Sequence, residues 1–177
     1  MIIVEHDVDA TLAGRLDLWF DAYGLPGTVY LPLVMVDSGH QISNGSEDFG
    51  AVYSDMIDDA LQRPAGADMA VDTERSGSVL RFDVGLVNHS GTTLSAGNEA
   101  TLTALIWREP IDPNALPYVV AGGTTAITSL ADGDTTEITF EVSAGSLDPT
   151  STRWVVIAHY RPGTDATHDT LQAVAGP

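Results

Sequence analysis

Apolar residues recur along this chain with two different periods, and the change between them falls at Arg63-Pro64. Before that point, segments in which apolar residues recur every three or four positions alternate with short apolar runs. After it, apolar and polar residues alternate in short runs separated by Gly, Asp, Asn and Thr. A period of two is typical of half-buried strands, and a period of 3.6 of amphipathic helices. The pattern therefore predicts an α/β part over residues 1–63 and an all-β part over residues 64–177.

The first part is predicted to contain, in order, a strand, a helix, two strands and a second helix. The strands are expected over residues 2–8, 33–36 and 40–43. Asp9 can cap the first helix, because its carboxylate accepts free N–H groups of the first turn, and Gly24 ends that helix. Ser46 or Glu47 is the expected cap of the second helix, which Pro64 ends. The two apolar stripes consist of Leu12, Leu16, Trp19, Phe20 and Tyr23, and of Phe49, Val52, Tyr53, Met56, Ile57, Ala60 and Leu61.

The second part is predicted to be a two-sheet antiparallel sandwich. Its clearest strand covers residues 79–87, where apolar residues alternate with Arg, Asp and Gly. The other strands are expected over residues 69–73, 101–107, 118–120, 125–130, 137–142, 153–160 and 171–174. Turns are expected between them at Asn88-His89-Ser90-Gly91 and Asp132-Gly133-Asp134. Strands that recur at intervals of about 8–12 residues are typical of such a sandwich.

Residues 23–63 resemble the second half of a thioredoxin-like domain. The run Leu31-Pro32-Leu33-Val34-Met35-Val36-Asp37 is similar to the family's stretch in which a proline precedes a strand. The turns Asp37-Ser38-Gly39 and Asn44-Gly45 match the hairpin turns of that family, and the second helix matches its closing helix. The resemblance implies that Pro32 is a structural residue and that the Leu31-Pro32 bond is cis.

The family's first strand and helix, which carry Cys-x-x-Cys, have no counterpart here, and the chain contains no cysteine. Thiol–disulfide exchange needs a thiolate nucleophile, so this chain cannot perform it. Loss of a central strand would leave unpaired sheet edges. The chain is then a fragment of a longer protein, a partner or second copy supplies the strand, or the sheet is rearranged. We favour the first two explanations.

Residues 80–107 resemble an immunoglobulin-like module of bacterial surface proteins. In such modules a strand that ends in Val-Asn-x-Ser-Gly, here Val87-Asn88-His89-Ser90-Gly91, precedes a hydrophobic strand. This resemblance implies a binding or spacer module without catalysis. Together, the two resemblances give the fold class as a two-part α+β chain. A partial thioredoxin-like α/β unit over residues 1–63 is followed by an antiparallel immunoglobulin-like β-sandwich over residues 64–177.

The chain is strongly acidic: 25 acidic residues face 7 basic ones, all Arg, for a formal net charge of −18. Such a surface repels the phosphates of nucleic acids and anionic lipids, so neither class of partner is expected. No apolar run approaches the roughly 20 residues that cross a bilayer, and membrane insertion is not expected. Cations or a basic protein surface suit the charge better. Acidity also has a general explanation, because it keeps proteins soluble.

No complete catalytic or metal-binding constellation is predicted, and no cofactor. The histidines, at positions 6, 40, 89, 159 and 168, lack the spacing of zinc motifs. His6 with Asp7 and Asp9 is the nearest approach to a site, and a solvated loop with a helix cap is the favoured interpretation. Asp132-Gly133-Asp134 offers oxygen ligands for Ca²⁺, but a tight turn is favoured. The glycosylation sequons Asn44-Gly45-Ser46 and Asn88-His89-Ser90 also stand at expected turns.

These observations favour a non-catalytic interaction or structural protein, secreted or at the cell surface. It would present a β-sandwich and an incomplete sheet to a protein partner or to copies of itself. One alternative is a fragment of a secreted thiol–disulfide oxidoreductase whose catalytic half is absent, and another is a Ca²⁺-dependent adhesion module. The first residues become polar too early for a signal peptide, so a secretion signal is not expected in this sequence.

Overall fold

The computed structural model describes residues 15–24, 30, 32–45, 48–108, 117–145, 148, 151–164 and 166–177. The N-terminal segment (the described residues up to Arg63) contains α1 (Arg15–Tyr23), β1 (Leu33–Val36), the 3-10 turn η2 (Asp37–Gly39), β2 (Gln41–Asn44) and α2 (Phe49–Leu61). The sandwich contains β3 (Ala67–Ser76), β4 (Val79–Asn88), β5 (Leu94–Ser95), the 3-10 turn η3 (Ala96–Asn98), β6 (Thr101–Arg108), β7 (Tyr118–Ala126), β8 (Ser129–Leu130), β9 (Thr135–Ser143), β10 (Thr152–Tyr160) and β11 (Asp169–Gly176).

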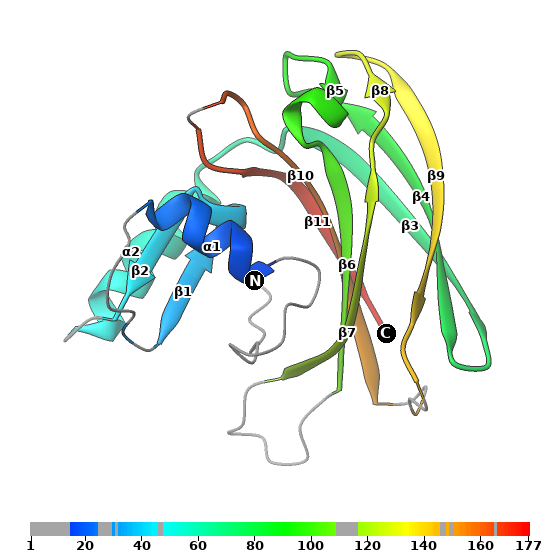
Figure 1. Cartoon of the computed structure of the whole chain (residues 1–177), viewed down its shortest axis with the longest axis horizontal. Coiled ribbons are helices and arrows are strands. Elements are labelled where there is room, and N and C mark those ends of the chain that lie inside the picture. The colour runs from blue at the N-terminus through cyan, green and yellow to red at the C-terminus, as the bar shows by residue number, and fades with distance from the viewer. Residues whose placement is uncertain are drawn as a thin grey trace.

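Two antiparallel sheets face each other to form the sandwich (Figure 1). One sheet has the order β11-β10-β6-β7 and the other has the order β3-β4-β9. The short pair of β5 and β8 lies at one end. Strand β3 contacts β11 on one side of the sandwich and β7 contacts β9 on the other, so the sheets meet along both edges. The antiparallel sandwich predicted from the period of two is confirmed.

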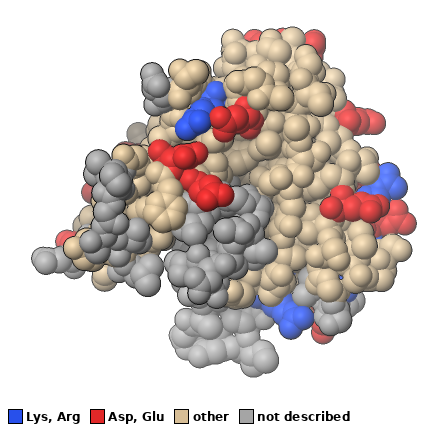
Figure 2. All heavy atoms as spheres, viewed as in Figure 1, with Lys and Arg blue, Asp and Glu red and all other residues tan. Residues whose placement is uncertain are grey.

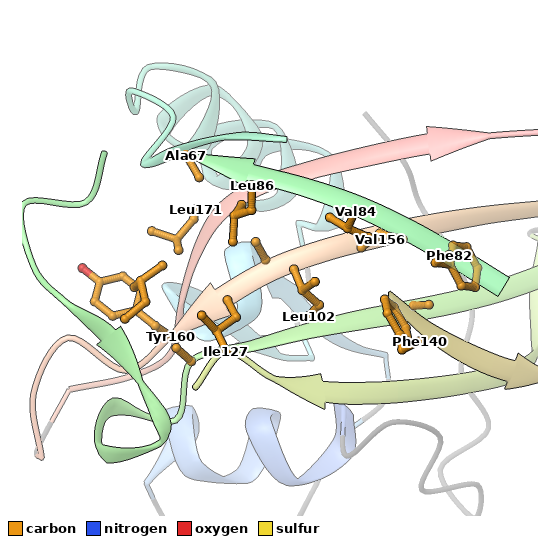
Figure 3. Close-up of a cluster of buried hydrophobic side chains, with 14 of the residues drawn as sticks. Ala67, Phe82, Val84, Leu86, Leu102, Ile127, Phe140, Val156, Tyr160 and Leu171 are labelled. Carbon is orange, nitrogen blue, oxygen red and sulfur yellow. The ribbon is translucent and has the colours of Figure 1, made fainter. Parts of the chain in front are cut away.

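The core lies between the sheets because buried and outward-facing residues alternate along the strands (Figure 3). On β4, Phe82, Val84 and Leu86 are buried, whereas the residues between them are only partly buried. The Phe82 ring stacks on Phe140 of β9 with 5.2 Å between centroids, and it meets Trp154 of β10 edge-on at 5.6 Å. Full burial of one such side chain contributes about 1.5–3 kcal/mol. The sandwich therefore has an apolar core of its own.

Strand β6 is buried on both faces, which explains why the six consecutive residues from Leu102 to Trp107 are all buried. Alternate residues join the core between the sheets. Leu105 and Trp107 form a second cluster with Val119 and Val155, on the outer face of the four-stranded sheet. Thr103 continues that outer face, because residues two apart point the same way. The outer face is thus apolar at one end and polar at the other.

Apolar burial is sparse in the N-terminal segment. Helix α1 packs on η2 and β2, and α2 packs on β1. Trp19 and Met56 are the buried hydrophobic side chains of the part of this segment that the structure describes. Trp19 stacks on Tyr23 with 4.8 Å between centroids. A two-stranded hairpin is marginally stable alone, so this one depends on the elements packed against it.

A polar joint holds the N-terminal segment against the β11 edge of the sandwich. Figure 1 shows the segment on that side of the molecule. Arg63 donates a hydrogen bond to Asp37 of η2 at 2.9 Å and another to Asp169 at the start of β11. The hydroxyls of Ser38 and Thr170 lie 2.8 Å apart, and Ser38 is buried. Asp37 and Ser38 have left-handed backbone, with φ of 51° and 57°. The joint therefore combines directional bonds with a tight turn.

The predicted two-part α+β fold, with its partial thioredoxin-like α/β unit, is wrong. The described part is mostly antiparallel β and has two α-helices, and its N-terminal strands form a two-stranded antiparallel hairpin rather than part of an α/β sheet. The error arose because periodicity predicts the type of an element and not the sheet that it joins. The domain division at Arg63-Pro64 stays a prediction.

Several local predictions also change or fall outside the described residues. Asp48 caps α2, because its carboxylate accepts from the Ala51 N–H at 3.3 Å; the residues predicted for this role, Ser46 and Glu47, are outside. The cis bond predicted at Leu31-Pro32 is also outside, because Leu31 is not described, and so is the strand predicted over residues 2–8. The Pro32 carbonyl accepts from the Gly45 N–H at 3.2 Å. None of the helices that the structure describes has the length and apolarity to cross a membrane.

Candidate functional site

A cleft of about 260 Å³ lies between α1 and the polar end of the outer face of the four-stranded sheet. It is lined by Asp17, Leu18, Asp21, Glu99, Thr101, Thr103, Thr124, His159 and His168. In Figure 2 acidic side chains gather beside the boundary between the N-terminal segment and the sandwich. Ligand sites often lie at such boundaries, because both structural units supply groups to them. We refer to this site as the cleft.

Two buried histidines lie side by side in the wall that the sandwich contributes to the cleft. His159 belongs to β10 and His168 immediately precedes β11, and the centroids of their rings are 5.5 Å apart. His159 is paired across the strands with Thr101, and its Nε2 lies 3.2 Å from the Thr103 hydroxyl. The antiparallel pairing of β10 with β11 brings together two histidines that are nine positions apart in the sequence.

His168 is held in one orientation by a carboxylate. Its Nε2 lies 3.1 Å from Glu99 Oε2, and its side chain is 5 % exposed. The Nδ1 atom is buried and has no hydrogen-bond partner. Burial lowers the pKa of His168, and the nearby Glu99 carboxylate opposes that shift. A neutral ring that donates from Nε2 to Glu99 leaves Nδ1 as an unprotonated acceptor. An unmade bond of this kind costs about 1–3 kcal/mol.

Three carboxylates stand on the rim of the cleft, and one guanidinium lies beside two of them. Asp17 and Asp21 come from α1, and Glu99 comes from the turn before β6. Arg161 follows β10 and lies 3.1 Å from Glu99 and 3.8 Å from Asp21. The side chains of Asp21 and Glu99 are about half exposed and Asp17 is exposed, so these charges face solvent. The guanidinium balances one of the three negative charges, and the rim remains acidic.

Backbone geometry places Glu99 at the cleft. A capping box closes η3, in which Ser95 accepts from Gly97 and the Asn98 side chain accepts from the Ser95 N–H. Glu99 then takes a left-handed conformation, with φ of 53°. A residue other than glycine adopts this conformation only where its surroundings enforce it, and such residues gather at functional sites. The strained position of Glu99 is therefore consistent with a binding role for the cleft.

The cleft contains one hydroxyl beside an imidazole. The closest approach to a nucleophile and base is the 3.2 Å contact of the Thr103 hydroxyl with His159 Nε2. Thr103 is 0 % exposed, although it lines the cleft. No group of three His, Asp or Glu side chains in the described part is placed to hold a metal ion. What the cleft offers is a set of hydrogen-bonding groups with excess negative charge.

Of the histidines weighed in the sequence, the structure brings together His159 and His168 and leaves the others apart. His6, with Asp7 and Asp9, lies outside the described residues. His40 is exposed, and His89 lies 3.1 Å from Asp68 on the other sheet.

The turns considered above as metal or glycosylation sites contain side chains that make structural hydrogen bonds. Gly133 has a φ of 81°, and the Asp132 carboxylate accepts from the Gly91 N–H at 2.8 Å. The Asn88 amide donates to the Thr92 and Leu130 carbonyls and is fully buried. The Asn44 amide donates to the Tyr23 hydroxyl. These side chains are occupied in holding turns and connections.

The cleft was not predicted from the sequence. His159 stands in the most apolar run of the chain, where core packing is the default interpretation, and Glu99 stands in an unpredicted turn. A usable signal was present: His159 and His168 flank a turn between two strands that were both predicted. Pairing those strands as a hairpin would have suggested that the two histidines are neighbours.

No protein-family model matches the chain, and no curated protein matches it. Among solved structures, the chain is similar to HBP35 of Porphyromonas gingivalis, with a TM-score of 0.57 and 14% sequence identity. That match covers 91% of this chain and 57% of the HBP35 chain, so this chain spans little more than half of that protein. The likeness shows the β-rich fold alone.

Two further matches are too weak to carry an argument. β-Glucosidase 3B from Thermotoga neapolitana has a TM-score of 0.37 and 12% identity, over 63% of this chain and 16% of that one. The penta-heme cytochrome c552 from Thermochromatium tepidum has a TM-score of 0.36 and 11% identity, over 92% of this chain and 50% of that one.

Proposed function

We propose that this protein is a non-catalytic interaction protein that works outside the cytoplasm and binds a basic segment of a protein partner at the cleft. The observation that carries the proposal is the acidic rim above two buried histidines, built jointly by α1 and the sandwich. The formal net charge of −18 steers a positively charged partner toward the molecule, and the cleft gives that partner a place to dock.

Support for a role outside the cytoplasm comes from the architecture, because many cell-surface domains are β-sandwiches. Support for binding without catalysis comes from the burial of Thr103, whose hydroxyl is the one that lies beside an imidazole in the cleft. The alternative of a thiol–disulfide oxidoreductase fragment rested on the α/β unit that the fold overturns. No observation in the described part favours a calcium adhesin, because Asp132 serves a turn.

Fluorescence anisotropy of a labelled 12-residue peptide of alternating Lys and Gly, titrated with the full chain, tests the proposal. We expect saturable binding that weakens as salt is raised, and no binding of the Glu-Gly counterpart. The double variant Asp17→Asn/Asp21→Asn should weaken binding roughly fivefold or more.

The matched control is Glu137→Gln/Glu141→Gln, which removes the same charge from exposed positions on β9, on the other sheet. It should change the affinity by less than about twofold. Absence of binding, or equal loss in both double variants, would contradict a partner site at the cleft.

A further inference from the structure

The chain passes from the N-terminal segment into the sandwich through two exposed residues, Pro64-Ala65. On one side of them, the Arg63 N–H still donates to a carbonyl of the last turn of α2, at 3.2 Å. On the other side, Gly66 is fastened to the sandwich. Its N–H donates to the Leu171 carbonyl, and its own carbonyl accepts from the His89 N–H, each at 2.9 Å. Two exposed residues between two fastened ones have the geometry of a hinge.

The described links between the N-terminal segment and the sandwich are polar. They are the ion pairs Arg63–Asp169 and Asp21–Arg161 and the hydroxyl pair Ser38–Thr170. Neither apolar cluster of the described part includes a residue of the segment. The side chains of the two ion pairs are 22–53% exposed, so salt screens their attraction. The segment is therefore held by contacts that can open without disturbing the core between the sheets.

The α1 wall of the cleft is positioned through the same contacts. Helix α1 packs on η2 so closely that a Cβ at Gly39 would lie 2.9 Å from the Cβ of Ala22, and η2 in turn contacts β11. Asp17 and Asp21 of α1 keep their places in the cleft as long as η2 stays on β11. Glu99 belongs to the sandwich and does not depend on that contact.

We infer that the N-terminal segment is a hinged lid on the cleft, with Arg63 as its latch. While Arg63 holds Asp169, α1 completes the cleft. When this pair opens, the segment turns at Pro64-Ala65 and carries the α1 carboxylates away. Arg63 does not line the cleft and is a positioning residue.

The lid gives the cleft a form of regulation. A partner that contacts both walls binds the closed position better than the open one, and by linkage it favours closure to the same extent. High salt and loss of the latch favour the open position. This part of the inference rests on the proposed function and adds to it a condition for binding.

Pulsed EPR distances between two spin labels test the lid in the full chain. The chain contains no cysteine, so two introduced cysteines place the labels. Ser54→Cys on α2 with Ser129→Cys on β8, both at exposed serines, spans the hinge. Phe20→Cys on α1 with Ser54→Cys lies within the segment, and Phe20 is an exposed residue outside the cleft lining.

At low salt the spanning pair should give one main distance. Arg63→Met, or roughly 1 M NaCl, should raise the fraction of a second distance about fivefold or more, while the pair within the segment keeps its distance. Arg63→Lys keeps the charge but not the planar fork, and should fall between Arg63→Met and the unaltered chain. Arg81→Met, at an ion pair within the sandwich, is the matched control and should change neither distance.

Binding of the Lys-Gly peptide separates the lid from a simple effect of charge. Arg63→Met and Arg81→Met each remove one positive charge, and net charge alone would make both bind a basic peptide more tightly. The lid predicts instead that Arg63→Met binds it about twofold or more weakly than Arg81→Met, because only the closed fraction is competent. Saturating peptide should also return Arg63→Met to the main distance.

A spanning distance that stays fixed in Arg63→Met and at high salt would overturn the inference. A change within the segment would overturn it too, because the segment would then unfold rather than turn. Peptide binding that leaves the second distance in place would contradict the regulation. If the distances change as expected but no peptide binds, the hinge stands and the proposed function is wrong. If the peptide binds while the spanning distance never changes, the proposed function stands and the lid is wrong.

Discussion

The sandwich and the joint that holds the N-terminal segment are built from different interactions. Between the sheets, apolar side chains such as Phe82, Leu86 and Val156 are fully buried. At the joint, the contacts are charged or hydroxylic: Arg63 bridges two carboxylates, and Ser38 meets Thr170. Apolar burial is non-directional and large, whereas partly exposed polar contacts are directional and contribute less. The apolar core of the sandwich therefore accounts for most of the stability, and the joint fixes where the N-terminal segment lies on the sandwich.

Backbone strain follows the same division. In the described part, the residues other than glycine with positive φ are Asp37, Ser38 and Glu99. Asp37 and Ser38 form the joint, and Glu99 contacts His168 in the cleft. Strained backbone persists only where its surroundings hold it. At Asp37 and Ser38 these are the contacts between the two parts, and at Glu99 they are the capping box of η3. The cleft depends on how the N-terminal segment is placed, because α1 supplies part of its lining.

The largest effect is expected in the core. Phe82→Ala should reduce the free energy of unfolding by roughly 3–5 kcal/mol, because it leaves a cavity beside Phe140 and Trp154. The same change at Phe20 on α1, whose side chain is 45% exposed, should cost less than about 1 kcal/mol. Urea unfolding of both variants measures the difference. Equal losses would remove the contrast between core and periphery.

The second-largest effect tests whether the two sheets are tightly packed against each other. A Cβ at Gly123 of β7 would lie 2.8 Å from a methyl carbon of Val142, a stiff side chain of the opposite sheet. Gly123→Ala should therefore destabilise the protein by roughly 1–3 kcal/mol. Gly85→Ala, where a Cβ meets nothing within 4 Å, is the matched control and should be neutral or slightly stabilising. A harmless Gly123→Ala would show that the sheets are loosely apposed.

Removal of the charge at the joint should have a smaller and more local effect. Arg63→Met leaves Asp37 and Asp169 without their shared partner and should cost about 1–2 kcal/mol, because the Arg63 side chain is 26% exposed. Arg81→Met breaks a more exposed pair with Asp83 on the sandwich and should cost less than Arg63→Met. Thermal unfolding of the two variants compares them. A larger loss for Arg81→Met would contradict the role of the joint.

The smallest effect concerns pH. Burial lowers the pKa of His168 below its ordinary value of 6.5, so the folded protein binds fewer protons there than the unfolded chain. Its contribution to stability is fully present above pH 6.5 and is lost as pH falls through the lowered pKa. His168→Gln should therefore flatten the decline of stability below pH 6.5, measured relative to the unaltered chain. A decline in His168→Gln as steep as that of the unaltered chain would contradict the assignment.

Much of the sandwich could be predicted because the alternation of apolar and polar residues along a strand indicates which face is buried. The alternation over residues 79–87 corresponds to β4, and the apolar run over 153–160 corresponds to β10. Separate strands were predicted at 118–120 and 125–130, and the structure has two strands there with other bounds: β7 runs from Tyr118 to Ala126 and β8 covers Ser129–Leu130. Gly122 and Gly123 both lie within β7, and Gly123 is where Val142 of the other sheet comes close. A glycine that admits a neighbour and one that ends a strand look alike in sequence.

The cleft and the joint could not be predicted in the same way, because both depend on long-range pairing. In the sequence, Arg63 is recognisable only as the residue at the end of the second predicted helix. Its partners, Asp37 and Asp169, lie 26 and 106 positions away. His159 and His168 become neighbours through a register that includes an irregularity after Ala158. Local periodicity carries no information on such a register.

Native-state hydrogen exchange, in the unaltered chain and in Arg63→Met, tests the central claim most directly. The account predicts that amides of α1 and of the β1–β2 hairpin exchange through openings that require less free energy than those of β6 and β10. It further predicts that Arg63→Met lowers the opening free energy of the first group and leaves that of the second almost unchanged. A single opening free energy for both groups, shifted equally by the substitution, would contradict it.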